Sequence, residues 1–171
     1  MAGQWSRSEL EKAFLVYQET VERAAQSGDW NLFVDLFTPD ADYIEHMYGT
    51  FHGHDQIRAW ITNTMGTFPG NRMPGFPIAW SVVDEERGWI VCEIRNLMVD
   101  PGDGGAHEAS NITILKYAGD NRWASEEDVY NPLHFRTMVI AWARSADAHG
   151  TLSDDDRASM DSMMPGWSRA A

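Results

Sequence analysis

The sequence predicts an α+β fold in which helices cover one face of a curved, mostly antiparallel sheet. Three observations carry this prediction: helical spacing of apolar residues near the start, four strand-like runs separated by short turns between residues 78 and 130, and a second helical pattern after them. With 171 residues, 43% of them hydrophobic, the chain can bury one sizeable core. We therefore expect one domain over residues 1–150, followed by a C-terminal extension over residues 151–171.

The first part of the chain is predicted to be mainly helical. Apolar residues recur every three or four positions over residues 8–27, which is typical of an amphipathic helix. A short helix is expected over residues 30–37, and the alternating run at residues 41–48 predicts a strand. Residues 49–53 are expected to form a turn, and a third helix begins near His54.

The second part is predicted to form an antiparallel meander. Short turns join antiparallel neighbours, because a parallel pair needs a longer crossover connection. The four runs are separated by turns rich in Gly, Asp and Asn, and they cover residues 78–84, 89–100, 107–118 and 123–130. Asn131 and Pro132 then supply an N-cap and a first helical residue, so a helix follows.

Charge and composition limit the classes of partner. The chain has 13 Lys and Arg against 26 Asp and Glu, a formal net charge of −13. Nucleic acids and anionic membrane surfaces are bound by clustered cations, so neither is expected as a partner. No apolar run approaches the ~20 residues that span a bilayer, and no signal peptide is visible, so we expect a soluble cytoplasmic protein. The only cysteine, Cys92, excludes an internal disulfide and Cys-rich metal sites.

Three segments of the sequence resemble the nuclear transport factor two-like superfamily. They are Ser27-Gly-Asp-Trp30, Leu36-Phe-Thr-Pro-Asp-Ala-Asp-Tyr43 and Gly49-Thr-Phe-His-Gly-His-Asp-Gln-Ile-Arg-Ala-Trp60. More narrowly, they are similar to the SnoaL-like group, which includes polyketide cyclases, steroid isomerases and scytalone dehydratase. The resemblance covers about residues 8–140. It implies a cone-shaped barrel, in which the sheet wraps around the N-terminal helices and leaves an internal pocket.

The same resemblance implies candidate catalytic residues. Glu45 falls where the steroid isomerases keep a general base or, in a second alignment, where scytalone dehydratase keeps a Tyr. Asn111 resembles a catalytic Asn of scytalone dehydratase, and Asp128 resembles the last-strand Asp of limonene epoxide hydrolases. Val21 and Thr113, however, stand where the steroid isomerases keep their oxyanion-binding residues. None of these activities is therefore expected to transfer whole.

Strand alternation gives Glu45 its expected orientation. Tyr43, Glu45 and Met47 share one strand face, and the resemblance turns that face inward. A carboxylate on an apolar concave face is desolvated, which favours the neutral acid and suits the group to proton transfer near neutral pH. Alternatively, Glu45 lies at the rim and pairs with Arg58 or Arg95.

Two amides are predicted to face each other on neighbouring strands. A turn centred near Asp103 sets Asn96 opposite Asn111 and Ile94 opposite Thr113. Buried amides are costly without partners, and one way to satisfy both is to hold a ligand oxygen between them. The alternative is a structural pair that bonds only to itself or to the backbone.

The last strand offers a second carboxylate, Asp128, which shares a face with Glu126. The sequence leaves open whether this face or the face of Ser125 and Glu127 points inward. Beside Glu45, an inward Asp128 would form a carboxylate pair. The aromatic candidates for substrate binding are Tyr43, Tyr130 and Trp80, each a residue type that is more often part of the core.

The predicted function follows from these residues. The spacing of His46, His52 and His54 fits no zinc signature, so no metal or other cofactor is expected. We expect a cofactor-independent proton-transfer enzyme, a dehydratase, isomerase or cyclase, acting on a hydrophobic oxygenated molecule such as a polyketide, steroid or terpenoid. Glu45 would take a proton, the two Asn side chains would hold the substrate, and Asp128 or a Tyr would return the proton. The alternative is a non-catalytic binding or assembly domain on the same fold.

Two further expectations concern surfaces. The outward strand residues Trp89, Val91, Leu97 and Val99 would leave an apolar patch, which predicts a homodimer. The extension is expected to pack over the pocket mouth or across the dimer, because it carries an apolar side formed by Met160, Met163, Met164 and Trp167.

Overall fold

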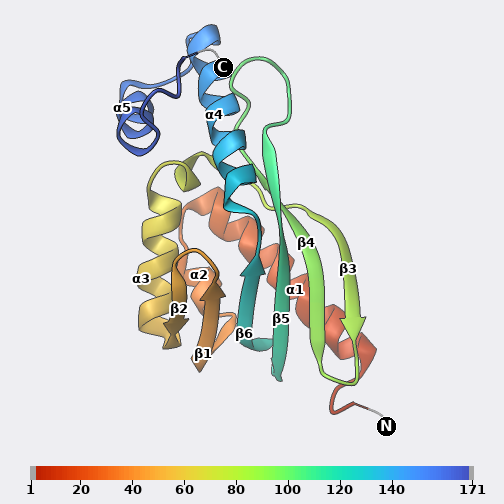
Figure 1. The fold of residues 1–171 in the computed structure, drawn as a ribbon. Helices are drawn as coiled ribbons and strands as arrows, with labels where there is room; N and C mark the ends of the chain where they lie inside the picture. The colour runs from red at the N-terminus through yellow and green to blue at the C-terminus, as the bar shows by residue number, and fades with distance from the viewer. Residues whose placement is uncertain (1–2, 170–171) are drawn as a thin grey trace.

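A curved six-stranded sheet is the framework of the protein in the computed structural model, which describes residues 3–169 (Figure 1). The strands lie in the order β2-β1-β6-β5-β4-β3, and all neighbours are antiparallel except the parallel pair β1 and β6. Their bounds are Phe37–Glu45 (β1), Gly49–His52 (β2), Ile78–Asp84 (β3), Trp89–Leu97 (β4), Glu108–Gly119 (β5) and Arg122–Val129 (β6). The α+β class and the antiparallel meander are confirmed, although the sheet stays open, with β2 and β3 at its edges.

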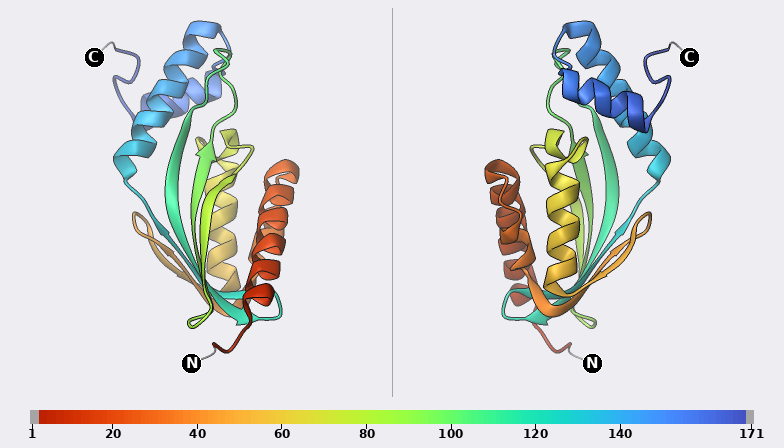
Figure 2. Two further views of the ribbon diagram at one scale, coloured as in Figure 1. Left: turned by 90° about the vertical axis from the view of Figure 1, so that its right-hand side faces the viewer. Right: turned by 90° about the vertical axis from the view of Figure 1, so that its left-hand side faces the viewer.

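The helices fall into two groups. Figure 2 shows α1 and α3 on one side of the sheet, whereas α4 and α5 lie beyond its upper end. The bounds are Arg7–Ser27 (α1), Asn31–Val34 (α2), Gly53–Gly66 (α3), Pro132–His149 (α4) and Asp154–Met163 (α5), with a short 3-10 turn at Gly70–Arg72. Ser6 caps α1 by accepting a hydrogen bond from the backbone N–H of Glu9, and Gly28 ends it with a left-handed φ of 72°.

The segment after α1 differs from its prediction. The second helix ends at Val34, and β1 begins at Phe37 and ends at Glu45, instead of spanning residues 41–48. Pro39 disfavours helical geometry in the residue before it, and the strand accommodates Pro39 where the pairing of β1 with β6 is irregular. The expected turn at residues 49–53 is mostly strand β2, which pairs with β1 from Glu45↔Gly49 to Asp42↔His52. The actual turn is residues 46–48, so Met47 is not part of the strand.

The pairing of β4 with β5 also differs from its prediction. Asn96 lies opposite Ala109, and Ile94 lies opposite Asn111, which is a shift of two residues. The connection after β4 is a long loop, in which the carboxylate of Asp100 accepts hydrogen bonds from the backbone N–H groups of Gly102 and Gly104. Because side chains alternate with period two, a shift of two residues leaves the predicted inward faces unchanged.

The protein has two hydrophobic clusters. The larger lies between the sheet and α1 to α3, and its fully buried members include Leu10, Phe37, Leu115 and Trp123. The smaller lies under α4 and α5, where Trp142, Met160 and Trp167 are buried. We call residues 132–169, which contribute most of the second cluster, the C-terminal cap. No helix among residues 3–169 is long and apolar enough to cross a membrane.

The cap is attached to the rest of the protein by an ion pair. The guanidinium of Arg72 contacts both carboxylate oxygens of Asp156 on α5, at 2.8 and 3.1 Å. Ser153 caps α5 by accepting a hydrogen bond from the backbone N–H of Asp156. The segment after α4 therefore packs on the domain through both apolar and charged contacts.

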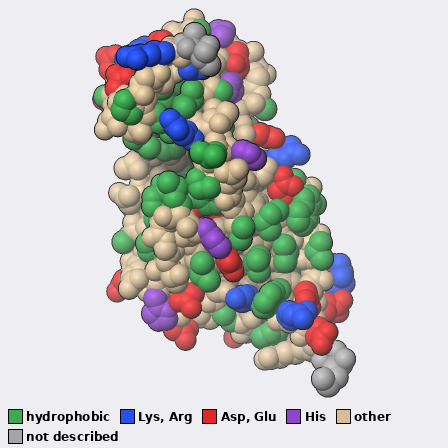
Figure 3. Space-filling view, in the orientation of Figure 1, with side chains coloured by type: hydrophobic (Ala, Val, Ile, Leu, Met, Phe, Trp, Pro, Cys, Tyr) green, Lys and Arg blue, Asp and Glu red, His purple; other side chains and the backbone are tan. Residues whose placement is uncertain are grey.

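The outer face of the sheet carries exposed apolar side chains. Figure 3 shows them gathered over the strands of the meander. Trp80, Val82 and Val129 are exposed by 44%, 57% and 39%. The predicted outward residues Trp89 and Val91 lie on this face too, whereas the alternate residues Ile90, Cys92 and Ile94 of the same strand are buried on the other side.

Candidate functional site

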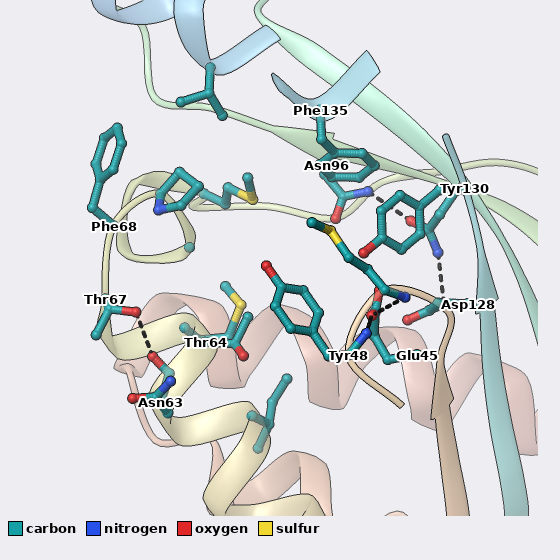
Figure 4. A pocket seen from close by; sticks show the side chains of 18 of the residues that line it. Glu45, Tyr48, Asn63, Thr64, Thr67, Phe68, Asn96, Asp128, Tyr130 and Phe135 are labelled. Atoms are coloured by element: carbon teal, nitrogen blue, oxygen red, sulfur yellow. Dashed lines mark hydrogen bonds between the residues drawn. The ribbon is translucent and has the colours of Figure 1, made fainter. Parts of the chain in front are cut away.

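A cavity of about 1150 Å³ lies between the inner face of the sheet, α3 and the C-terminal cap. Most of its lining is apolar. The acidic side chains gather at one end, where Figure 4 shows Glu45, Asp128 and Tyr130 close together, away from Asn63 of α3 and from Thr67, which follows that helix. The polar lining residues at this end, which we call the acid floor, are Tyr17, Tyr43, Glu45, Asn96, Asn111, Glu126, Asp128 and Tyr130.

The sheet sets the spacing of the three carboxylates. Glu45 on β1 lies directly beside Asp128 on β6, and Asp128 lies opposite Thr113 on β5. Glu126 sits two residues earlier on the same face of β6, beside Tyr43 of β1. The face that the sequence left open is therefore that of Glu126 and Asp128.

An extra residue in β6 explains why the sequence did not settle this orientation. Trp123 pairs with Tyr117, and Ser125 pairs with Lys116, so one residue of β6 has no opposite partner between them. Such a β-bulge shifts the alternation by one position. Trp123 and Glu126 consequently both point inward, although they are three residues apart.

Asp128 accepts three hydrogen bonds from protein side chains. The donors are the hydroxyl of Tyr43 at 2.5 Å, the hydroxyl of Thr113 at 2.5 Å and the amide of Asn111 at 2.7 Å. Burial raises the pKa of Asp128, the hydrogen bonds from Thr113, Tyr43 and Asn111 oppose that rise, and the nearby Glu45 carboxylate adds to it. Asp128 is thus a firmly held acceptor in the centre of the acid floor.

Glu45 is buried, with 4% of its surface exposed. Its Oε2 atom accepts hydrogen bonds from the backbone N–H groups of Met47 and Tyr48, both at 2.8 Å, and this fixes the carboxylate at the turn after β1. The alternative that Glu45 pairs with an arginine is wrong. Arg58 binds Asn31 and Asp55, and Arg95 lies 3.8 Å from Glu108.

The two predicted tyrosines both line the acid floor. Tyr43 donates its hydroxyl to Asp128, and burial, followed by the charges of Asp128 and Glu126, raises its pKa well above the ordinary value. Burial also raises the pKa of Tyr130, and the neighbouring Glu45 carboxylate raises it further. Both phenols therefore remain protonated hydrogen-bond donors near neutral pH.

The two asparagines meet, but their N–H groups are already used. The Asn96 amide donates to the backbone oxygen of Ala109 at 3.1 Å and to Asn111 Oδ1 at 2.7 Å. The Asn111 amide donates to Asp128 and to Thr113, each at 2.7 Å. The prediction that both amides donate to a ligand oxygen is therefore wrong for this arrangement. The pair instead forms a relay that orients Asp128.

The acid floor contains a pair that the sequence interpretation did not include among its site residues. Glu126 is only 2% exposed, and its Oε1 atom accepts a hydrogen bond from the Tyr17 hydroxyl at 2.9 Å. Burial raises the pKa of Glu126 well above the ordinary value, Asp128 raises it further, and the bond from Tyr17 opposes the rise. The available signal was Tyr17 on the buried face of α1, because a buried tyrosine hydroxyl usually needs a polar partner.

Trp80 is not a wall of the cavity, contrary to its prediction. It lies on edge strand β3 with 44% of its surface exposed, and its indole N–H donates to Glu93 at 2.6 Å. Both residues belong to the outer face of the sheet. Strand alternation could not predict which face Trp80 occupies, because the pairing of β3 with β4 shifts between Ile78 and Trp80.

The histidines have separate partners. His46 contacts Glu127, His52 contacts Asp42, and the ring of His54 contacts the backbone oxygen of Phe37. Over the described residues 3–169, no three His, Cys, Asp or Glu side chains are grouped so that they could hold a metal ion.

A curved sheet covered by helices around a mostly apolar cavity with a polar end defines the class of cone-shaped α+β domains with an internal pocket. The chain belongs to the SnoaL-like domain family, whose model matches residues 17–126. The resemblance seen in the sequence is thereby confirmed. No curated protein sequence matches the chain significantly.

Solved structures share this fold at low sequence identity. A candidate SnoaL-like polyketide cyclase from Jannaschia sp. CCS1 is 16% identical with a TM-score of 0.60, over 79% of this chain and 95% of its own. An NTF2-like protein from Anabaena variabilis is 16% identical with a TM-score of 0.56, over 75% and 96%. TerC, crystallised with polyporic acid, is 13% identical with a TM-score of 0.54, over 76% and 97%. At these identities the similarity demonstrates the fold alone.

Proposed function

We propose that this protein is a cofactor-independent enzyme that moves protons on a hydrophobic, oxygenated small molecule by general acid–base catalysis. One observation carries the proposal: Glu45, which is buried, and Asp128, which is partly buried, lie side by side on adjacent strands at the acid floor of a large, mostly apolar cavity. Two carboxylates in such a site can hold different protonation states, as acid–base catalysis requires.

Glu45 is the proposed general base. Its Oε2 atom is held by two backbone N–H groups, so the carboxylate is fixed in position. It would remove a proton from the carbon next to a substrate carbonyl. The C–H electron pair then forms a carbon–carbon double bond, and the carbonyl π electrons move to the oxygen. Tyr130, a protonated phenol beside Glu45, is suited to return a proton to the product.

Asp128 would position the reacting groups. The relay from Asn96 through Asn111, together with Thr113 and Tyr43, restrains both of its oxygens. Such restraint keeps the Asp128 carboxyl group in place beside Glu45, where it can accept a hydrogen bond from a protonated group between them. Dehydration, isomerisation and cyclisation all use such a proton-transfer step.

The cavity supports a bulky apolar substrate. Its volume of about 1150 Å³ exceeds the ~300 Å³ of a minimal small-molecule pocket, and aromatic and aliphatic side chains form most of its walls. Polyporic acid, the compound crystallised with TerC, and the polyketide substrate class named for the Jannaschia protein support an aromatic or polyketide-like molecule here.

The test is proton exchange, which requires no knowledge of the natural substrate. We expect the protein to accelerate hydrogen–deuterium exchange at the acidic carbon next to the carbonyl of 2-tetralone in D₂O, followed by NMR. Glu45→Gln should lower this rate by ~10²-fold or more, because it keeps the size of the side chain but removes the base.

Glu127→Gln is the matched control. Glu127 is one position from Asp128 but contacts His46 and does not line the cavity. It should leave the exchange rate unchanged. An exchange rate no higher than that of buffer, or equal effects of the two substitutions, would contradict the proposed enzyme.

The alternative is a non-catalytic binding domain. The saturated hydrogen bonds of Asn96 and Asn111 favour it, because a purely structural amide pair would be satisfied in the same way. Under this alternative 2-tetralone would bind without exchange, and Glu45→Gln would not alter the rate.

A further inference from the structure

Tyr48 is a large side chain that lines the cavity but has no part in the proposed proton transfer. It belongs to the turn after β1, 61% of its surface is exposed, and Figure 4 shows its ring extending into the cavity. The neighbouring Met47 also lines the cavity and is exposed. Apolar surface that stays open inside a cavity is suited to contact with a ligand.

Three hydrogen bonds fix the backbone of this turn to Glu45. The N–H of Tyr48 donates to the backbone oxygen of Glu45 at 3.2 Å and to its Oε2 atom at 2.8 Å. The N–H of Met47 donates to the same Oε2 atom at 2.8 Å. Closure of such a turn keeps the Cα atoms of Glu45 and Tyr48 within ~7 Å of each other. The proposed base therefore also fixes the position of Tyr48.

Two other aromatic residues support the ring of Tyr48. Phe51 of β2 and Trp60 of α3 stack with ring centroids 4.7 Å apart, and both pack against the larger hydrophobic cluster. The Tyr48 ring contacts Trp60 with centroids 5.0 Å apart and planes 43° apart. We call Phe51, Trp60 and Tyr48 the aromatic row. Trp60 and Tyr48 line the cavity and Phe51 does not, so the row ends inside the cavity.

We propose that Tyr48 is the platform on which an aromatic ring of the substrate stacks, as the next member of the aromatic row. Aromatic rings pack favourably at centroid distances of ~4.5–7 Å, and such pairs contribute more than the area that they bury. A tyrosine that is already held in place loses little conformational entropy on binding. Tyr48 therefore selects substrates that carry a planar aromatic ring beside the reacting carbonyl.

This platform deepens the proposed function and rests on it, because it assumes that the carbonyl of the same ligand faces Glu45. Since Glu45 fixes the turn, a ring stacked on Tyr48 holds its neighbouring carbon at a constant position relative to the base. Such alignment is what proton abstraction from carbon requires. Tyr48 is thus a specificity-determining residue, and the proton transfer itself belongs to Glu45.

The first test compares two ketones of similar shape in NMR titrations of the whole protein. 2-Tetralone has an aromatic ring fused to the ketone ring, whereas both rings of trans-2-decalone are saturated. The wild-type protein should bind 2-tetralone more tightly. Tyr48→Leu should lower this preference by ~2–10-fold, because it removes the ring but keeps an apolar side chain. Tyr48→Phe keeps the ring and should retain the preference.

Met47→Leu is the matched control. Met47 belongs to the same turn and lines the same cavity, but it has no ring. This substitution should change the affinities for the two ketones by the same factor. A Tyr48→Leu protein that retains the wild-type preference, or a Tyr48→Phe protein that loses it, would overturn the platform.

The second test locates the bound ring. The aromatic protons of 2-tetralone should shift upfield on binding, because protons above the face of an aromatic ring are shielded. Tyr48→Leu should reduce this shift, and Tyr48→Phe should preserve it. Equal shifts in the wild type and in Tyr48→Leu would show that the ligand ring lies elsewhere, which would also overturn the platform.

The two proposals can fail separately. Tyr48→Leu should raise the 2-tetralone concentration that gives half-maximal exchange more than it lowers the exchange rate at saturation. Glu45→Gln should lose exchange and keep the preference for 2-tetralone, because the amide oxygen of Gln can still accept the N–H groups of the turn. Exchange that survives Glu45→Gln would contradict the proposed function, whereas a preference that survives Tyr48→Leu would overturn the platform alone.

Discussion

Glu126 and Glu45 illustrate how two glutamates in one cavity acquire different surroundings. Glu45 receives two backbone N–H donors at a turn, whereas Glu126 receives one phenol and lies beside Asp128 with no cation near it. Strand parity together with the family resemblance predicted that Glu45 points inward. They did not predict the contact between Tyr17 and Glu126, because these residues are 109 positions apart and meet only when α1 packs on β6.

The raised pKa of Glu126 predicts a pH dependence of stability. Burial and the charge of Asp128 raise its pKa above the ordinary 4.5, so above that pH the unfolded chain loses a proton that the folded protein keeps. The stability contributed by this group is full below pH 4.5 and is lost as the pH rises through the folded-state pKa. Glu126→Gln cannot titrate, so its stability relative to the wild type should increase from about pH 5 to about pH 8.

Urea unfolding at both pH values measures this effect. Glu19→Gln is the control, because Glu19 is exposed on α1. Its stability relative to the wild type should be nearly the same at the two pH values. A Glu126→Gln difference that is equally independent of pH would mean that the carboxyl group is ionised in the folded protein.

At the level of elements, periodicity predicted every long helix and every strand of the meander. Local irregularities in strand pairing, however, limited how well the sequence could predict the orientation and neighbours of the site residues. The bulge between Trp123 and Ser125 reverses the alternation of inward and outward side chains along β6, so the orientation of Asp128 could not be predicted from the start of the strand. The loop after β4 moved the partner of Asn111 from Asn96 to Ile94. Such features depend on how two strands fit together, so a single strand's residue pattern does not contain them.

The attachment of α5 gives a prediction at this scale. Arg72→Met should remove the ion pair to Asp156, whose side chain is 5% exposed against 38% for Arg72. Because an unpaired carboxylate would remain largely buried, we expect the free energy of unfolding to fall by about 1–3 kcal/mol. This lies between the values for exposed and for buried ion pairs. Hydrogen exchange should increase over residues 154–163 and remain unchanged in α1.

The comparison is Arg58→Met, which removes an exposed contact with Asp55 on α3. Arg58→Met should lower the free energy of unfolding much less than Arg72→Met, and it should leave hydrogen exchange in α5 unaltered. Uniformly faster exchange throughout the Arg72→Met protein would indicate instead that the two hydrophobic clusters unfold as a single unit.

For the whole molecule, the outer face of the sheet predicts self-association. Val82 and Trp80 on β3 and Val129 on β6 are exposed on this face, and a large apolar surface of this kind is typical of an interface. We expect a dimer in light scattering at micromolar concentration. Val82→Lys should shift the protein toward the monomer, because it buries a charge at the contact.

Leu15→Lys serves as the control for this substitution. Leu15 is 54% exposed on α1, which lies on the other side of the sheet. It should leave the mass unchanged. A wild-type monomer, or a dimer that Val82→Lys does not weaken, would show that this sheet face is not the contact.

The position of the cavity between two separate hydrophobic clusters has an evolutionary consequence. The three carboxylates of the acid floor lie on β1 and β6, whereas the C-terminal cap contributes Leu133, Phe135 and Val139 to the cavity lining, with Phe135 packed against Tyr130. Mutations in the cap can alter the shape of the wall without disturbing the packing that holds the carboxylates. Substrate choice and proton transfer can therefore evolve at different rates, because they depend on different parts of the same short gene.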